Sequence, residues 1–83
     1  MTNEERKAAV EAFQTAARIT GESAWALGAQ IHDFEVDERL VSHYSETLQE
    51  DRSTLKDKYR RHWRYGWQNA LSERARRLLP AGG

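Results

Sequence analysis

Large apolar side chains recur at every fourth position in the last third of the chain: Leu55, Tyr59, Trp63, Trp67 and Leu71. Successive residues of an α-helix turn by about 100° around its axis, so this spacing places the side chains along one broad face. Pro80 follows, and a proline ring stops a helix. The pattern predicts a helix over about residues 53–79, with Trp63 and Trp67 as buried anchors and residues 80–83 as a frayed tail.

The composition supports a helical chain of one domain. The sequence has 83 residues, and nearly half of them are Ala, Glu, Lys, Leu or Arg, the residues that dominate long helices. A chain of this length is expected to form one small domain over residues 1–83. Cysteine is absent, which excludes disulfides, thiolate metal sites and a cysteine nucleophile.

A capping box predicts the start of a first helix. Thr2 stands three residues before Glu5, so each side chain can accept a hydrogen bond from an otherwise unpaired backbone N–H group. An apolar stripe follows, made of Val10, Phe13 and Ala17. Gly21 fits the left-handed residue that follows many helices. The first helix is therefore expected over about residues 3–20.

A second helix is expected over about residues 22–50. Its apolar stripe continues at helical spacing through Ala24, Leu27, Ile31, Phe34, Val41 and Leu48. The opposite side carries Trp25, Val36 and Leu40. A helix that is apolar on two sides generally packs between two others, so this segment is the candidate central helix. If the helix is interrupted, Asp37 is the expected N-cap residue of the restart.

Together the three segments predict an all-α fold, either a three-helix bundle or a long helical hairpin that covers its second apolar face with another copy of the chain. Self-association would add stability that so small a core lacks. Two pairs of small residues, Ala24 with Gly28 and Gly66 with Ala70, indicate either close helix approach or glycine tolerated in a stable helix.

Charge is distributed unevenly along the chain, although the formal net charge is zero. Residues 1–51 carry a net charge of −7, and residues 52–83 carry a net charge of +7. One interpretation is internal pairing, in which an acidic second helix lies antiparallel to a basic third helix. The other interpretation is a basic surface that is offered to a partner.

The outward-facing part of the last helix provides the candidate binding residues. Tyr65 points roughly opposite to the two buried tryptophans, with Arg61 and Arg64 on neighbouring parts of that face. An exposed tyrosine beside arginines is typical of a protein-binding hot spot. We therefore expect a small adaptor, regulator or inhibitor that binds a protein partner through these three residues. Trp25 is an alternative contact.

Two other functions remain open. The first is nucleic-acid binding through the arginines of the last helix: Arg60, Arg61, Arg64, Arg74, Arg76 and Arg77. A helix-turn-helix over residues 16–27 is disfavoured, because its second helix would offer mainly alanine and glycine to the base edges. The second is a metal-binding dimer. Two histidine–glutamate pairs have a spacing that places both side chains on one helix face: His32 with Glu35, and His43 with Glu46.

The sequence carries no motif for other classes of function. It lacks a phosphate-binding glycine loop and a nucleophile motif, so we expect no enzyme activity and no cofactor. The longest uncharged run near the middle, residues 23–32, is ten residues long, against roughly 20 for a membrane-spanning helix. The charged N-terminal residues do not fit a signal peptide, so a cytoplasmic location is expected.

Overall fold

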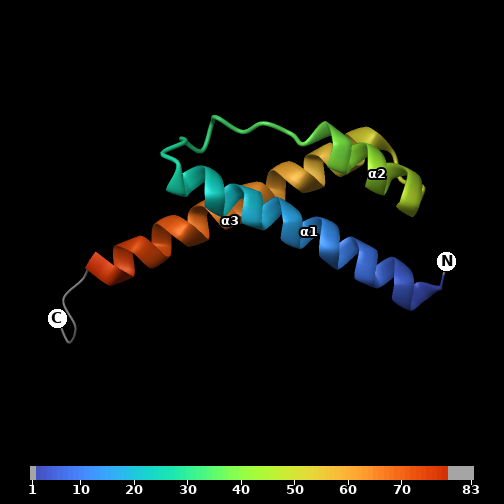
Figure 1. The fold of residues 1–83 in the computed structure, drawn as a ribbon, viewed down its shortest axis with the longest axis horizontal. Coiled ribbons are helices and arrows are strands. Elements are labelled where there is room, and N and C mark those ends of the chain that lie inside the picture. The colour runs from blue at the N-terminus through green and yellow to red at the C-terminus, as the bar shows by residue number, and fades with distance from the viewer. Residues whose placement is uncertain (1, 79–83) are drawn as a thin grey trace.

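A computed structural model describes residues 2–78, which form three helices and no strand (Figure 1). Helix α1 covers Asn3–Ala26, α2 covers Glu38–Leu48, and α3 covers Arg52–Leu78. The all-α prediction is confirmed, and the tail predicted over residues 80–83 lies outside the described residues. Over this part of the chain, no helix combines the length and the apolar character that crossing a lipid bilayer requires.

The two long helices, α1 and α3, run in the same direction and cross, while α2 runs back beside them (Figure 1). Phe13 packs against Tyr59, with ring centroids 6.1 Å apart, and the Arg18 backbone lies against Gly66 further along. From the first pair to the second, the residue numbers increase in both helices, as expected for a parallel pair. The expectation that the second helix is central is therefore wrong, because the main packing joins α1 to α3 and α2 is short.

Gly21 does not end α1, as its position in the sequence had indicated, but lies buried where α1 crosses α3. A Cβ atom at Gly21 would overlap the carbonyl oxygen of Trp63. Gly66 makes the reciprocal approach, since a Cβ atom there would overlap the carbonyl oxygen of Arg18. The two helices therefore touch backbone to backbone. The close approach considered for Gly66 is confirmed.

Residues 27–37, which we call the strap, replace the middle of the predicted helix 22–50 with non-helical chain. Gly28 has a φ of 89°, which residues with a side chain rarely adopt, so α1 ends just before it. The close helix approach considered for Ala24 and Gly28 is not found, because no atom lies within 4 Å of the position of a Gly28 Cβ.

Hydrogen bonds hold the strap near both of its ends. Near its start, Trp67 Nε1 donates a 2.8 Å hydrogen bond to the carbonyl oxygen of Ala29. At its end, the Asp37 carboxylate accepts a 3.1 Å hydrogen bond from the Leu40 N–H group and caps α2, which confirms the expected restart. Three of its apolar side chains pack on the core: Ile31, Phe34 and Val36. Leu27, on the expected apolar stripe, is instead 88% exposed, because α1 has ended there.

The core lies between the middle of α1 and the first half of α3, and beneath α2. It consists of Phe13, Ala17, Val41, Leu48, Leu55, Tyr59 and Trp63. Trp63 is 2% exposed, as predicted, whereas Trp67 is only partly buried. Leu71, which continues the predicted apolar face, is 45% exposed. The reason is that α3 extends past its crossing with α1, and residues 71–77 are all exposed.

Candidate functional site

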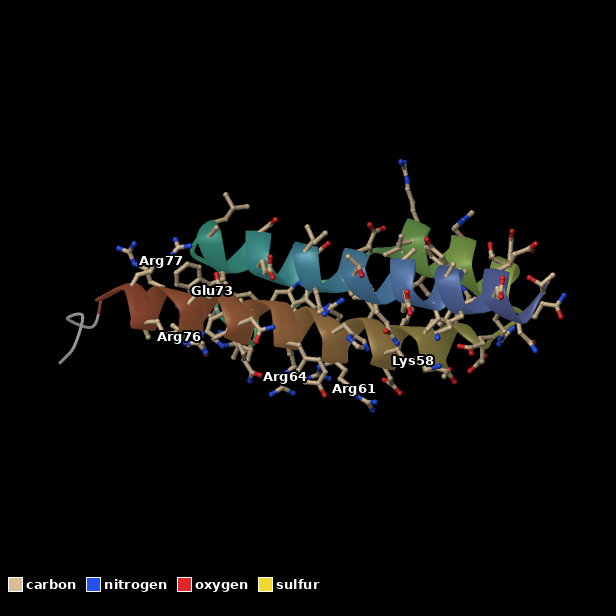
Figure 2. All side chains as sticks on the ribbon, turned by 90° about the horizontal axis from the view of Figure 1, so that it is seen from below. Lys58, Arg61, Arg64, Glu73, Arg76 and Arg77 are labelled. Carbon is tan, nitrogen blue, oxygen red and sulfur yellow. The ribbon has the colours of Figure 1, made fainter. Side chains whose placement is uncertain are left out.

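The face of α3 that points away from the core carries a surface hollow of about 520 Å³. Four of its lining residues follow one another at helical spacing: Asp57, Arg61, Arg64 and Gln68. Arg60 and Tyr65 flank this stripe and complete the lining. Figure 2 shows Arg61 and Arg64 on the side of α3 that faces away from α1. We call this surface the arginine hollow.

The structure brings three of the predicted binding residues together in the arginine hollow. Tyr65 is 47% exposed and lies beside the exposed guanidinium groups of Arg61 and Arg64. Trp25, the fourth predicted contact, lies in α1, is partly buried and does not line the hollow. Asp57 and Gln68 were not among the predicted residues, although their spacing of four residues from Arg61 and Arg64 is a signal that was available in the sequence.

His62 packs against Tyr65 of the arginine hollow and was also not among the predicted residues. Its ring meets the edge of Tyr65 almost at a right angle, with ring centroids 5.5 Å apart. Burial lowers the pKa of His62 below its usual range, and the positive charges of Arg18 and Arg61 lower it further. The imidazole is therefore neutral at physiological pH. The Tyr65 ring packs against an uncharged partner.

The acidic part of the chain neutralises only the first turns of α3. Lys56 Nζ lies 3.4 Å from a Glu38 carboxylate oxygen, and Lys58 Nζ lies 3.2 Å from a Glu50 carboxylate oxygen. Arg6 of α1 shares Glu50, at 3.3 Å. These pairs support the internal interpretation of the charge asymmetry for Lys56 and Lys58.

The arginines further along α3 are not neutralised in this way. Among residues 2–78, no ion pair involves any of the six arginines between positions 60 and 77, and Glu73 is the one acid in that stretch of sequence. Arg60 instead lies over the Phe34 ring, with 6.0 Å from its guanidinium carbon to the ring centroid. The arginine hollow therefore keeps a net positive charge even though Asp57 lines it.

The remaining arginines of the nucleic-acid hypothesis do not extend the arginine hollow. Arg74, Arg76 and Arg77 belong to the exposed end of α3. Figure 2 shows Arg76 and Arg77 leaving the helix on different sides. Cations around a helix C-terminus also interact favourably with its dipole, which gives them a structural role there.

The histidine–glutamate pairs of the metal hypothesis are not assembled into a site. His32 Nε2 lies 3.5 Å from Asp33 Oδ1, and the His43 ring packs edge-on against Tyr44 at 5.0 Å. Over residues 2–78, no three His, Cys, Asp or Glu side chains converge in a way that could hold a metal ion. Within a single chain, these residues provide no complete ligand set.

Comparison with protein-family models, with curated proteins and with solved structures finds no match to this chain. The functional inference therefore rests on the chemistry of the arginine hollow. Guanidinium groups recognise carboxylates through paired N–H···O hydrogen bonds, and a tyrosine adds a broad apolar contact with a polar tip.

Proposed function

We propose that this protein is a non-enzymatic interaction module that binds an acidic segment of a partner protein on the outer face of α3. The observation that carries the proposal is the arginine hollow itself. Three arginines and Tyr65 surround it, and none of these arginines takes part in an ion pair among residues 2–78. The two lysines of the first turns of α3, Lys56 and Lys58, are already paired within the chain.

The chemistry of the hollow suits carboxylates on a protein surface. Arg61 and Arg64 are three residues apart, which is about 4.5 Å along the helix axis. Acidic side chains one turn apart on a partner helix have a matching spacing. Tyr65 and arginine are the residue types that most often dominate the binding energy of protein interfaces.

A protein partner fits this surface better than a nucleic acid does. Among residues 2–78, Tyr65 is the one aromatic side chain that lines the hollow, so successive bases would find no second ring on which to stack. Asp57 in the same hollow would repel a phosphate backbone. The diverging directions of Arg76 and Arg77 also prevent one continuous track along a duplex (Figure 2).

The test measures binding of a fluorescent glutamate-rich peptide to the full chain and to the variants Arg61→Ala and Tyr65→Ala. Each variant is expected to weaken peptide binding about tenfold, because truncating a hot-spot residue costs more than about 1 kcal/mol. Arg39→Ala is the matched control, since Arg39 is an exposed arginine of α2 outside the hollow. All three variants should melt at the same temperature as the unchanged chain.

The same titrations are run with a short DNA duplex. Tighter binding of the duplex than of the peptide, with a steep loss of affinity as salt is raised, would favour the nucleic-acid alternative. Equal binding of the peptide by Arg61→Ala and by Arg39→Ala would show that the arginine hollow is not the contact surface.

A further inference from the structure

A second hollow of about 390 Å³ lies beneath the strap, between the last turns of α1 and the middle of α3. Binding sites for small molecules begin near about 300 Å³, so its size is sufficient for one. It shares no lining residue with the arginine hollow. It is therefore a separate feature of the molecule.

The floor of this hollow contains a buried hydroxyl group without a hydrogen-bond partner. Tyr59 is 0% exposed, and its Oη makes no hydrogen bond within residues 2–78. The Thr20 hydroxyl lies beside it, but its own proton goes to the Ala16 carbonyl oxygen, 2.8 Å away, so Thr20 can only accept from Tyr59 and supplies no donor to Tyr59 Oη. Buried hydroxyl groups are normally paired, so this one indicates a group that the chain itself does not supply.

The rim of the hollow is acidic. Asp33, Glu35 and Asp37 line it, and no Lys or Arg lies within ion-pair distance of any of them in the described part of the chain. Backbone N–H groups hold two of these carboxylates in place, at 2.9 Å for Asp33 and 3.1 Å for Asp37. Glu35 is exposed and has no such partner among the described residues.

The negative charge of the rim affects the ionisation of Tyr59 at the floor of the hollow. Burial raises the pKa of Tyr59, the neighbouring Thr20 hydroxyl lowers it by a smaller amount, and the Asp37 carboxylate raises it by less again. Tyr59 therefore stays protonated at neutral pH, and its Oη can accept a hydrogen bond as well as donate one. A cationic N–H donor would satisfy both the hydroxyl oxygen and the negative rim.

The shape and the walls select the kind of cation. The carboxylates do not converge as metal ligands, because no cluster of three His, Cys, Asp or Glu side chains suited to a metal occurs within residues 2–78. Ala24, Leu27 and Val36 line the hollow with apolar surface, and Trp63 adds an indole. Apolar walls beneath a negative rim fit a cation that carries a hydrocarbon chain, and an indole also attracts cations.

We propose that the hollow under the strap binds a primary ammonium group on a short alkyl chain, either a free alkyl amine or a lysine side chain of a partner. The ammonium group donates hydrogen bonds to Tyr59 Oη and to the Glu35 carboxylate, while the alkyl chain packs against Trp63 and Val36. Because Tyr59 Oη is covered in the structure, the strap must open to admit the ammonium group and then close over it, which returns Glu35 and Val36 to the hollow.

The experiment titrates the full chain with n-hexylammonium chloride and follows the three tryptophan indole N–H signals by NMR. We expect saturable shifts of the Trp63 signal and binding about tenfold tighter than that of n-hexanol, its neutral counterpart. Nα-acetyl-lysine amide forms the second arm. Tighter binding of the lysine derivative identifies a partner side chain as the occupant, and tighter binding of hexylammonium identifies a free amine.

Two variants remove the proposed contacts. Tyr59→Phe should weaken hexylammonium binding about tenfold, because it deletes a hydrogen bond to a charged group. It should leave the melting temperature unchanged or higher, because it also removes an unpaired buried hydroxyl. Glu35→Gln should weaken binding severalfold without any effect on folding, since Glu35 is exposed. Tyr44→Phe and Glu46→Gln, outside the hollow, are the matched controls.

The proposal is overturned if hexanol binds as tightly as hexylammonium, if no saturable shift of the Trp63 signal is seen, or if Glu35→Gln binds like Glu46→Gln. Should Tyr59→Phe fail to fold, the comparison of hexylammonium binding by Glu35→Gln and by Glu46→Gln still tests the proposal. The outcome does not depend on the arginine hollow, because the two hollows share no residue.

Discussion

At the scale of a single residue, His62 is partly buried and packs against Tyr65 of the arginine hollow. Its Nδ1 atom is buried without a hydrogen-bond partner among the described residues, and its pKa is lowered by burial and then by Arg18 and Arg61. The folded protein therefore takes up this proton at a lower pH than the unfolded chain, in which histidine has its usual pKa of 6.5. As the pH falls below that value, the unfolded state gains protons first, so the free energy of unfolding decreases.

The first prediction follows from this decrease in the free energy of unfolding at low pH. The midpoint of urea unfolding should decrease between about pH 7.5 and about pH 5.5 in the unchanged chain, and the decrease should be smaller in His62→Gln. His32→Gln is the control, because His32 is exposed. An equal decrease in the unchanged chain and in His62→Gln would mean that protonation of His62 is not what destabilises the fold at low pH.

The crossing of α1 and α3 gives the prediction at the scale of elements. Gly21→Ala removes a glycine from the interior of a helix, and helix propensity alone would raise stability by about 0.8–1 kcal/mol. The added Cβ atom would, however, overlap the backbone carbonyl oxygen of Trp63, which cannot rotate away as a side chain does. We expect a net loss of about 1–3 kcal/mol, seen as a lower melting temperature. A rise in melting temperature would show that the helices can separate without cost.

The same crossing explains where the sequence was informative about elements and where it was not. Periodicity identified α3 within one residue of its start and placed Trp63 inside and Tyr65 outside, because both follow from the helical repeat. Gly21 was ambiguous, since a glycine that stops a helix and a glycine that admits a second helix look alike until the second helix is placed.

The strap and the charges were ambiguous for a related reason. Three apolar residues of the strap, Ile31, Phe34 and Val36, keep roughly helical spacing, yet they pack on the core from non-helical chain once Gly28 has turned the backbone. Arg61 and Arg64 were predicted as binding residues from their face of the helix alone, and the structure shows that both line the arginine hollow. The sequence did not predict that the lysines of α3 would be paired and its later arginines unpaired. This difference arises because α2 lies beside only the first turns of α3.

At the scale of the whole molecule, α3 extends beyond the rest of the fold. The chain measures 50 × 27 × 15 Å, and residues 71–77 are exposed on the part of α3 that lies past its crossing with α1 (Figure 1). Elements that bury no apolar surface open and close without disturbing the core. The described end of α3 should therefore be separable from the cooperative unit formed by α1, α2 and the first two-thirds of α3.

Two proline variants in the same helix test this separation. Ala75→Pro should reduce the helical signal by one or two turns and change the stability of the core by less than about 1 kcal/mol. Ala70→Pro, at the partly buried crossing, should cost about 3 kcal/mol or more, a large share of what holds a small domain together. The measurement is thermal unfolding followed by circular dichroism, with the mass in solution determined for each protein. If Ala75→Pro unfolds the chain as Ala70→Pro does and also lowers the mass, then the end of α3 is covered by a second copy in solution, and the molecule folds as an assembly.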